Sequence, residues 1–398
     1  MCFSPYKRLC HWGPLTALGI IKCVTGMTIH CSNMWWPPSS SLAGLLNSIC
    51  FLSLSGLTLY NFLSASFNGP GFLPLGWTPV SFIIMLIFFF NKFIKINTFM
   101  QKNEEDTEFL QSCVICNGFK APRSHHCRKC GRCVMKMDHH CPWINNCVGW
   151  KNQCHFTSFL FFAVCGCAHA SIVLACSLYH GIHRVWYQYY GTGLEPVVYL
   201  NMYTLVFCVF SLGLAVGVVL AVGMLLYFQV RSIVKNITGI EEWIIEKAEH
   251  RQRDDIFIFP YNLGFWKNVK QVINLSGDPT GDGITWSVLD SCDQYTLTKE
   301  QLSQKQEKRQ RTRVYRIIKP ATGNWLPLFS QGLWVCLRPP LTDEPRIALQ
   351  IDDTVQVTRW KKYWLFGEKI NNKDPKQRIR GWFPRQCAVE MMEIKKDE

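Results

Sequence analysis

Charged side chains are missing from four long stretches of this 398-residue sequence, although 42 Lys and Arg occur in it. Each stretch exceeds roughly 20 residues, the length that a helix needs to cross a hydrocarbon core of about 30 Å. The stretches are residues 13–36, 41–67, 155–182 and 197–230, and the one charged residue in them is Lys22. The first two are not separated by a small-residue cleavage site, which excludes a cleavable signal peptide. We therefore predict a membrane protein with four spans.

Charge is also scarce in two of the connections between these stretches. The connection 32–40 has no charged residue, and 183–196 has only Arg184 and Glu195, whereas the stretch 92–151 is rich in Lys and Arg. Because cytosolic loops carry the excess of Lys and Arg, we expect both termini and the central loop to be cytosolic. A loop tethered between spans has no access to chromatin, so nucleic acid is not an expected partner.

One apolar run is too short to span a membrane. Its uninterrupted core extends from Phe82 to Phe90, well below the length of a crossing helix. If this run did cross, it would place the basic central loop on the opposite side and break the charge rule. We predict an interfacial or re-entrant segment, and a faulty gene model is the remaining interpretation.

Cysteine and histidine are concentrated in the central loop. Seven of the 20 cysteines fall between residues 113 and 147, in the order C-x2-C-x9-H-C-x2-C-x2-C-x6-H-C-x5-C. In a cytosolic loop these thiols should be reduced or bound to metal. Paired C-x2-C steps are typical of tetrahedral zinc sites. Two sites of three Cys and one His would use six cysteines, so one thiol and two of the four histidines in this loop are left over.

Counting alone does not show which thiol is spare, but the segment MDHHCPWINNC favours Cys141. This cysteine alone is flanked by Asp138 and two histidines, and a nearby base activates a thiol as a nucleophile. If His140 binds metal, His139 can act as the base and Asp138 can orient its ring. A zinc module with one idle cysteine is the alternative.

The same loop has no acidic residue between Phe109 and Met137. Such a basic surface could be solvated, bind anionic headgroups or receive a phosphorylated substrate. Its six basic residues are Lys120, Arg123, Arg128, Lys129, Arg132 and Lys136.

The stretch from Cys113 to about Phe156 resembles the cysteine-rich domain of the DHHC-type protein S-acyltransferases. The resemblance rests on KAPRSHHCRKCGRC, on Asp138-His139-His140-Cys141 and on PWINNCVGWKN. It implies transfer of a long-chain fatty acyl group such as palmitoyl from acyl-CoA to cysteines of membrane-associated proteins, through an acyl-enzyme on Cys141. His139 would be the base, and Asp138 would orient it.

The resemblance also implies two structural zinc ions with interleaved ligands. The first would bind Cys113, Cys116, His126 and Cys133, and the second Cys127, Cys130, His140 and Cys147. Part of the basic surface would then contact the phosphates of coenzyme A, and the expected contacts are Lys120, Arg123, Arg128 and Lys129.

Three further motifs of the family occur in altered form. Asp-Pro-Gly is replaced by the turn 69–71, Gly-Pro-Gly, which loses the acid. Thr-Thr-x-Glu is replaced by Thr238-Gly239-Ile240-Glu241, so any contact that needs the second hydroxyl is in doubt. The aromatic and Asn-containing tail motif is similar to 259–272, with Pro260, Tyr261, Asn262 and Gly264 at the matching positions.

From about residue 313 the composition changes to short strands rich in β-branched and aromatic residues. Trp360 or Trp364, Gly367 and the segment 381–384, Gly-Trp-Phe-Pro, resemble a Src-homology-3 domain, which could bind a partner protein. A DHHC-type enzyme with such a domain resembles one subfamily of the endoplasmic reticulum. The terminal residues 395–398, Lys-Lys-Asp-Glu, are similar to a dilysine retrieval signal of that compartment.

The predicted fold is an α-helical polytopic membrane protein with a cytosolic two-zinc domain and a small C-terminal β-barrel. Its expected parts are 1–92 with two spans, 93–154 with the zinc and DHHC motifs, 155–230 with two spans, 231–312 as a cytosolic tail, 313–392 as the barrel and 393–398 as the retrieval signal. The predicted activity is that of a protein S-palmitoyltransferase. The alternatives are a catalytically silent scaffold and an acyl-CoA thioesterase.

Overall fold

The computed structural model describes residues 8–79, 107–251, 256–274, 277–325, 327, 331–342, 344–370 and 379–391. The expected interfacial segment 82–90 and the C-terminal lysines lie outside these ranges. The chain divides into two compact units, Met1–Glu300 and Gln301–Glu398, which are described separately below.

Four long apolar helices occupy the first unit, and they confirm the predicted spans. They are α2 (Trp12–Trp35), α3 (Leu42–Phe67), α6 (Gln153–Ile182) and α8 (Met202–Lys235). The fourth begins and ends five residues later than expected. Asn201 accepts a hydrogen bond from the backbone of Thr204 and so starts α8, and the left-handed conformation of Asn236 ends it.

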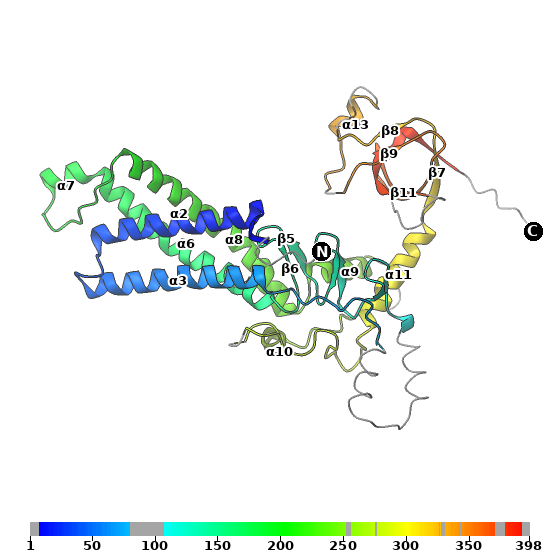
Figure 1. Ribbon diagram of the computed structural model, residues 1–398, viewed down its shortest axis with the longest axis horizontal. Coiled ribbons are helices and arrows are strands. Elements are labelled where there is room, and N and C mark those ends of the chain that lie inside the picture. The colour runs from blue at the N-terminus through cyan, green and yellow to red at the C-terminus, as the bar shows by residue number, and fades with distance from the viewer. Residues whose placement is uncertain are drawn as a thin grey trace, which may run out of the picture. The chain divides into compact units, whose positions relative to one another are not determined.

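α6 lies against each of the other three long helices. Figure 1 shows the four side by side, with β5 and β6 at one end and α7 (Arg184–Tyr190) at the other. Small and medium side chains let the helices approach closely: Val24, Phe51, Ala170 and Ala215 form one buried cluster across all four. The apolar faces not covered in this way contain exposed leucines, valines and phenylalanines, as expected for surfaces that meet lipid.

The cysteine-rich segment forms three short antiparallel hairpins, each of two strands. They are β1 (Ser112–Cys113) with β2 (Gly118–Phe119), β3 (His125–Cys127) with β4 (Arg132–Val134), and β5 (His139–Cys141) with β6 (Asn146–Val148). Strands of two or three residues cannot stabilise a domain by their ladders alone. The hairpins therefore depend on other cross-links, which the clustered Cys and His side chains can supply.

Two contacts fasten the third hairpin to the helix bundle. The Asn146 side chain is fully buried and donates hydrogen bonds to the carbonyls of Ala65 and Asn68 at the end of α3, at 3.1 and 2.9 Å. At the start of α2, a Cβ on Gly13 would lie 2.1 Å from the Pro142 carbonyl oxygen. Only glycine permits this approach, which holds the loop after Cys141 against the bundle.

The turn at residues 69–71 also docks on the cysteine-rich segment, through its backbone. The Gly71 carbonyl accepts a hydrogen bond from Met135, and the Pro70 carbonyl accepts one from Lys151. Gly71 has φ +86°, which favours glycine. The turn thus makes these contacts through its backbone and without an acidic side chain.

Beyond α8, three short helices complete this part of the chain. They are α9 (Gly239–Glu249), α10 (Phe265–Lys270) and α11 (Thr296–Gln310), which continues past Glu300 into the second unit. α9 begins with a capping box in which Thr238 and Glu241 each bind the other's backbone N–H. Tyr261 is fully buried, and its hydroxyl donates to the Gln294 carbonyl at 2.7 Å.

The second unit contains a five-stranded antiparallel sheet in the order β12-β11-β10-β7-β13. The strands are β7 (Arg313–Ile317), β10 (Thr354–Trp360), β11 (Trp364–Lys369), β12 (Arg380–Pro384) and β13 (Ala388–Glu390), with a 3-10 helix, η1 (Arg385–Cys387), before the last one. A second pair, β8 (Ala321–Thr322) and β9 (Ala348–Leu349), and the short helix α13 (Leu333–Leu337) lie between β7 and β10 in sequence. Alternate residues of the strands fill one core, including Ile317, Val355, Val357, Leu365 and Phe383. The predicted small β domain is confirmed.

Candidate active site

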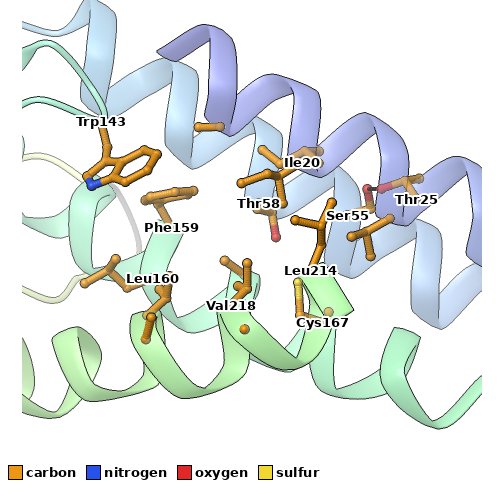
Figure 2. Close-up of a pocket in the computed structure, with 18 of the residues that line it drawn as sticks. Ile20, Thr25, Ser55, Thr58, Trp143, Phe159, Leu160, Cys167, Leu214 and Val218 are labelled. Atoms are coloured by element: carbon orange, nitrogen blue, oxygen red, sulfur yellow. Dashed lines mark hydrogen bonds between the residues drawn. The ribbon is translucent and has the colours of Figure 1, made fainter. Parts of the chain in front are cut away.

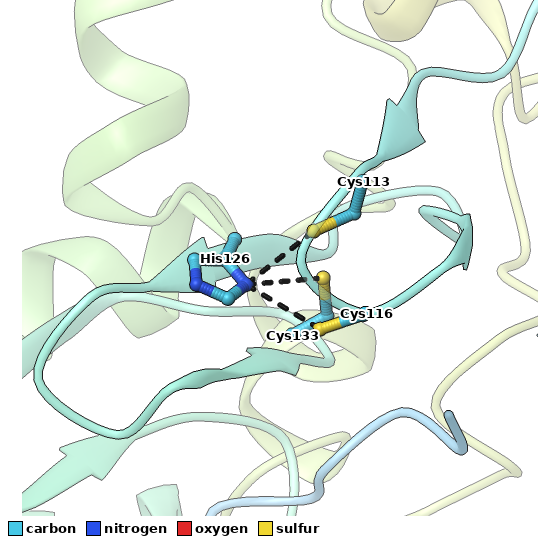
Figure 3. A group of neighbouring side chains, drawn as sticks. All are labelled: Cys113, Cys116, His126 and Cys133. Carbon is cyan, nitrogen blue, oxygen red and sulfur yellow. Dashed lines mark hydrogen bonds between the residues drawn. The ribbon is translucent and has the colours of Figure 1, made fainter. Parts of the chain in front are cut away.

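The structure brings together the first predicted metal-ligand set. His126 lies on β3 and Cys133 opposite it on β4, while Cys113 and Cys116 come from the first hairpin and its turn. The His126 Nδ1 atom lies 3.4 Å from Sγ of Cys113 and of Cys116, and 3.9 Å from Sγ of Cys133 (Figure 3). Zinc bonds of about 2.0–2.3 Å in a tetrahedron separate neighbouring ligand atoms by about 3.4–3.8 Å, so these side chains fit a zinc ion.

The second predicted set is assembled in the same way one hairpin further on. His140 on β5 lies opposite Cys147 on β6, and Cys127 and Cys130 come from the end of β3 and its turn. The His140 Nδ1 atom is 3.4 Å from Sγ of Cys130, 3.6 Å from Cys147 and 3.7 Å from Cys127. This donor set of three thiols and one imidazole also fits zinc.

Cys141 belongs to neither set and lies beside His139 and Asp138. Its side chain is buried in a cluster of apolar residues from the helices and the third hairpin. The Nδ1 atom of His139 is 3.0 Å from Oδ2 of Asp138. Partial burial alone would lower the pKa of His139, but its hydrogen bonds to Asp138 and Cys141 raise this pKa to about 10. The imidazole therefore favours its protonated form, which can stabilise a thiolate at Cys141.

Asp138 is held from its other side by the start of α9. Its Oδ1 atom accepts a hydrogen bond of 2.6 Å from the backbone N–H of Gly239. Burial alone would raise the pKa of Asp138, but the hydrogen bonds from His139 and Gly239 keep it below the usual value. The altered Thr238-Gly239-Ile240-Glu241 motif thus contacts the site through its backbone, not through a hydroxyl at the second position.

Glu241 of the same motif forms a fully buried ion pair with Arg123. The guanidinium donates from Nε and Nη2 to the two carboxylate oxygens, both at 2.7 Å, and also to Asn236. Burial would raise the pKa of Glu241, but Arg123 holds it below the usual value. The pair connects the segment just before the second hairpin to the first turn of α9.

This pairing corrects one of the four predicted coenzyme A contacts. Arg123 is buried and its donors are committed to Glu241 and Asn236, so it cannot bind a phosphate. Lys120 is half-buried, whereas Arg128 and Lys129 are exposed. No local pattern in the sequence distinguishes Arg123 from the other three residues. The one signal that points to a partner for Arg123 is Glu241, a residue of opposite charge in the capping motif of α9.

An apolar cavity of about 340 Å³ runs among the four long helices and reaches Cys141. Figure 2 shows Trp143 at one end and Thr25 and Ser55 at the other, with Phe159 and Leu160 along the wall. Thr25 and Ser55 hydrogen-bond to each other at 2.7 Å, and Thr58 donates to Leu54 within its own helix. The few polar groups in this wall are satisfied internally, so the cavity suits a hydrocarbon chain.

A second cavity, of about 900 Å³, opens beside the first. We call it the mouth; its wall includes Asp138 and His139, the last turns of α8 and one side of α9. Cys141 lines both cavities. A thiol beside an acid and an imidazole, at the junction of an apolar and a polar cavity, can react with the head of a molecule whose tail is apolar.

These features define a class of protein, a polytopic helical protein whose Cys/His-rich hairpins place a reactive cysteine at the end of an apolar cavity. Residues 106–246 match the model of the DHHC palmitoyltransferase family. The chain is 42% identical over 400 residues to Palmitoyltransferase ZDHHC6 of Homo sapiens, covering 96% of this chain and 91% of that protein. The Danio rerio protein of the same name is 43% identical, with 96% and 92% covered.

A plant protein is more distant. Probable protein S-acyltransferase 15 of Arabidopsis thaliana is 28% identical over 240 residues, which cover 60% of this chain and 83% of that protein. The chain therefore belongs to the DHHC palmitoyltransferase family, and the predicted enzyme class, a protein S-palmitoyltransferase, is confirmed.

Proposed function

We propose that Cys141 carries the acyl group between two transfer steps. The observation that supports this most directly is the position of Cys141, which is outside both metal-ligand sets, beside His139 and at the junction of the two cavities. Long-chain acyl-CoA is the donor. Its chain lies in the apolar cavity, its thioester lies at Cys141 and its polar part extends into the mouth.

In the first step Cys141, whose proton has already passed to His139 to give a thiolate beside an imidazolium, attacks the thioester carbonyl carbon through its sulfur. A new carbon–sulfur bond forms, and the carbonyl π electrons move to oxygen to give a tetrahedral oxyanion. When this collapses, the bond to the coenzyme A sulfur breaks, and that sulfur takes the proton from His139. Asp138 orients the imidazole and stabilises its positive charge, as in other sets of nucleophile, base and acid.

In the second step the thiol of a membrane-associated protein attacks the acyl-enzyme. His139 accepts the proton of this thiol, and Cys141 leaves as a thiolate and regains the proton. The product is a palmitoylated cysteine on the acceptor protein. Every proton and sulfur is accounted for without a further reactant.

The two Cys/His sets hold structural zinc in this proposal. Zinc bound by three thiolates and one imidazole has no open position, so it contributes folding energy and not a Lewis acid. The first ion would bind Cys113, Cys116, His126 and Cys133, and the second Cys127, Cys130, His140 and Cys147. Because His140 and Cys147 pair across β5 and β6, the second ion would fix the strand that carries His139 and Cys141.

Phosphates of coenzyme A would be received by the three predicted basic contacts that remain after the correction at Arg123, of which Lys120 is half-buried and the other two are exposed. These are Lys120, Arg128 and Lys129. Their number and flexibility suit a mobile, multiply charged ligand that is anchored elsewhere by its acyl chain. The acyl chain, and not these contacts, would supply most of the binding energy.

We further propose that the protein lies in the endoplasmic reticulum membrane with both termini and the catalytic loop in the cytosol. The Lys and Arg of 92–151 and the uncharged connection 32–40 support the orientation. The resemblance to the subfamily of the endoplasmic reticulum supports the compartment. The strand order of the second unit, with a 3-10 helix before β13, supports a Src-homology-3-like domain that binds a partner protein.

The proposed function is tested by following the acyl group from palmitoyl-CoA to an acceptor protein in one reaction. Purified protein is incubated with labelled palmitoyl-CoA, with and without an acceptor protein that carries a juxtamembrane cysteine. We expect acyl transfer that requires both the acceptor and Cys141. A thioesterase would release free fatty acid at the same rate with or without the acceptor, and a silent scaffold would do neither.

A further inference from the structure

The wall shared by the two cavities shows where the head of an acyl-CoA must lie. Both cavities are lined by Cys141, Trp143, Phe156, Leu160 and Leu225. Leu225 lies on α8, and the next residue one helical turn toward the end of that helix is Gln229, which lines the mouth only. One turn of helix is about 5.4 Å, so Gln229 follows directly after the junction at Cys141.

Gln229 is a buried polar residue without a satisfied donor. Its side chain is 5% exposed, and its Nε2 atom has no hydrogen-bond partner within the described residues. Buried side-chain donors are almost always paired, because an unpaired one destabilises the fold. The terminal amide torsion of glutamine is broad, so a half-turn can direct the N–H group at a ligand in the mouth. An unpaired donor in the wall of a substrate cavity is explained by an acceptor on the substrate.

The other polar groups of the mouth have different roles or partners. Arg231 and Glu242 form an ion pair at 3.0 Å, and Asp138 is occupied by His139 and Gly239. Trp143 also carries an uncharged donor, but among the side chains that the structure describes in the wall of the mouth, Gln229 is the one whose buried donor lacks a partner. The nearest acceptors on a bound acyl-CoA are carbonyl oxygens, either of the thioester itself or of the first amide of the pantetheine arm.

We propose that the side-chain amide of Gln229 donates a hydrogen bond to a carbonyl oxygen of the bound acyl-CoA and so positions the thioester at Cys141. This inference rests on the proposed function. A bond to the thioester oxygen strengthens as the oxyanion forms and raises the rate of the chemical step. A bond to the pantetheine amide is equally strong before and during the reaction. It therefore lowers only the concentration of acyl-CoA that half-saturates the enzyme.

The test measures acyl-enzyme formation in single turnover with the full-length protein over a range of palmitoyl-CoA concentrations. Gln229→Met keeps the length of the side chain and removes the donor, and Gln229→Glu keeps its shape and replaces the donor with an acceptor. Gln188→Met is the matched control, because Gln188 is exposed on α7 and lines neither cavity. Thermal unfolding and metal content of every variant establish that the fold is kept.

We expect both Gln229 variants to lose about 5- to 15-fold in the ratio of maximal rate to half-saturating concentration, as for one lost hydrogen bond, while Gln188→Met equals the parent. A fall in maximal rate assigns the bond to the thioester oxygen, and a rise in half-saturating concentration alone assigns it to the pantetheine amide. If both Gln229 variants fold and react within twofold of the parent, the inference is wrong. If the parent forms no acyl-enzyme, the proposed function itself fails.

Discussion

The carboxylate of Asp138 accepts a 2.6 Å hydrogen bond from the backbone N–H of Gly239, which lies 101 residues later in the chain. This bond joins the catalytic hairpin to the first turn of α9. It uses an N–H that would otherwise lack a partner, because the first backbone donors of a helix have no acceptor within it. The helix start also favours the negative charge of the carboxylate.

Gly239→Pro should remove this bond, and its Cδ should also displace the Asp138 carboxylate, which lies 2.6 Å from the nitrogen, while α9 itself is kept. Proline is tolerated at the first position of a helix, and the preceding Thr238 already has extended angles, φ −85° and ψ 161°. Without the donor, Asp138 loses a charge-assisted hydrogen bond, and we expect acyl-enzyme formation to slow by about tenfold or more. Gly239→Ala, which keeps the N–H and whose Cβ would meet only Asp138 Oδ1 at 3.5 Å, is the control. Equal rates for the two variants would show that the bond has no catalytic role.

Glu241→Gln should destabilise the protein strongly. Arg123 and Glu241 are both fully buried, and removal of one charge leaves the other without its partner at a cost of about 3–5 kcal/mol. The expected result is a clear fall in the unfolding temperature in detergent. Glu242→Gln, one residue later in an exposed ion pair with Arg231, should change that temperature little. Similar effects of the two substitutions would contradict the buried role of Glu241.

Cys130→Ser should release one metal ion and lower solubility, because metal ligation by this residue contributes to folding. Cys130 and Cys147 have their sulfur atoms 3.5 Å apart beside His140. Metal content measured by atomic emission should fall from two zinc ions per chain to one. Cys141→Ser is the matched variant and should retain both ions. Loss of zinc from the second variant would overturn the separation of ligand and nucleophile.

Phe51→Ala should shift the preferred acyl chain to longer lengths. Phe51 lines the apolar cavity and also a smaller cavity of about 190 Å³ between α2 and α3, which is distinct from the mouth. Removing the ring would join these spaces at the far end from Cys141. Competition between acyl-CoAs of increasing length should favour longer chains in the variant than in the parent. Leu59→Ala, at a residue of α3 that lines neither cavity, should keep the parent's preference.

The spans and the small β domain could be predicted from the sequence because each produces a local pattern of residues. Long uncharged apolar runs indicate the helices, and short runs rich in β-branched and aromatic residues indicate the strands. Neither pattern requires knowledge of the segments that these elements pack against. The metal-ligand sets could be predicted only in part from such local patterns. Counting left one thiol without a role, and family resemblance was needed to assign it to Cys141. In the structure His126 lies opposite Cys133, and His140 opposite Cys147, in separate hairpins, and Cys141 is outside both groups.

Contacts between distant segments escaped sequence reasoning. The basic residues around Arg123 predict a phosphate contact, whereas its partner in the structure, Glu241, lies 118 residues away. The cavity likewise has no local signature, since Phe51 and Ser55 of α3 and Gly213 of α8 line it only after the four long helices have packed. The backbone of Gly239 could not be foreseen as a donor to Asp138, because the motif suggested a missing hydroxyl.

The identity of the acylated residue tests the separation of nucleophile and metal ligands most directly. Protein incubated with palmitoyl-CoA is digested, and the acyl group is located by mass spectrometry with and without hydroxylamine. We expect a hydroxylamine-sensitive palmitoyl group on Cys141 and on none of the other six cysteines between residues 113 and 147, and no such group in Cys141→Ser. An acyl group on Cys130 or Cys147 in the folded protein, or equal labelling of Cys141→Ser, would contradict the assignment.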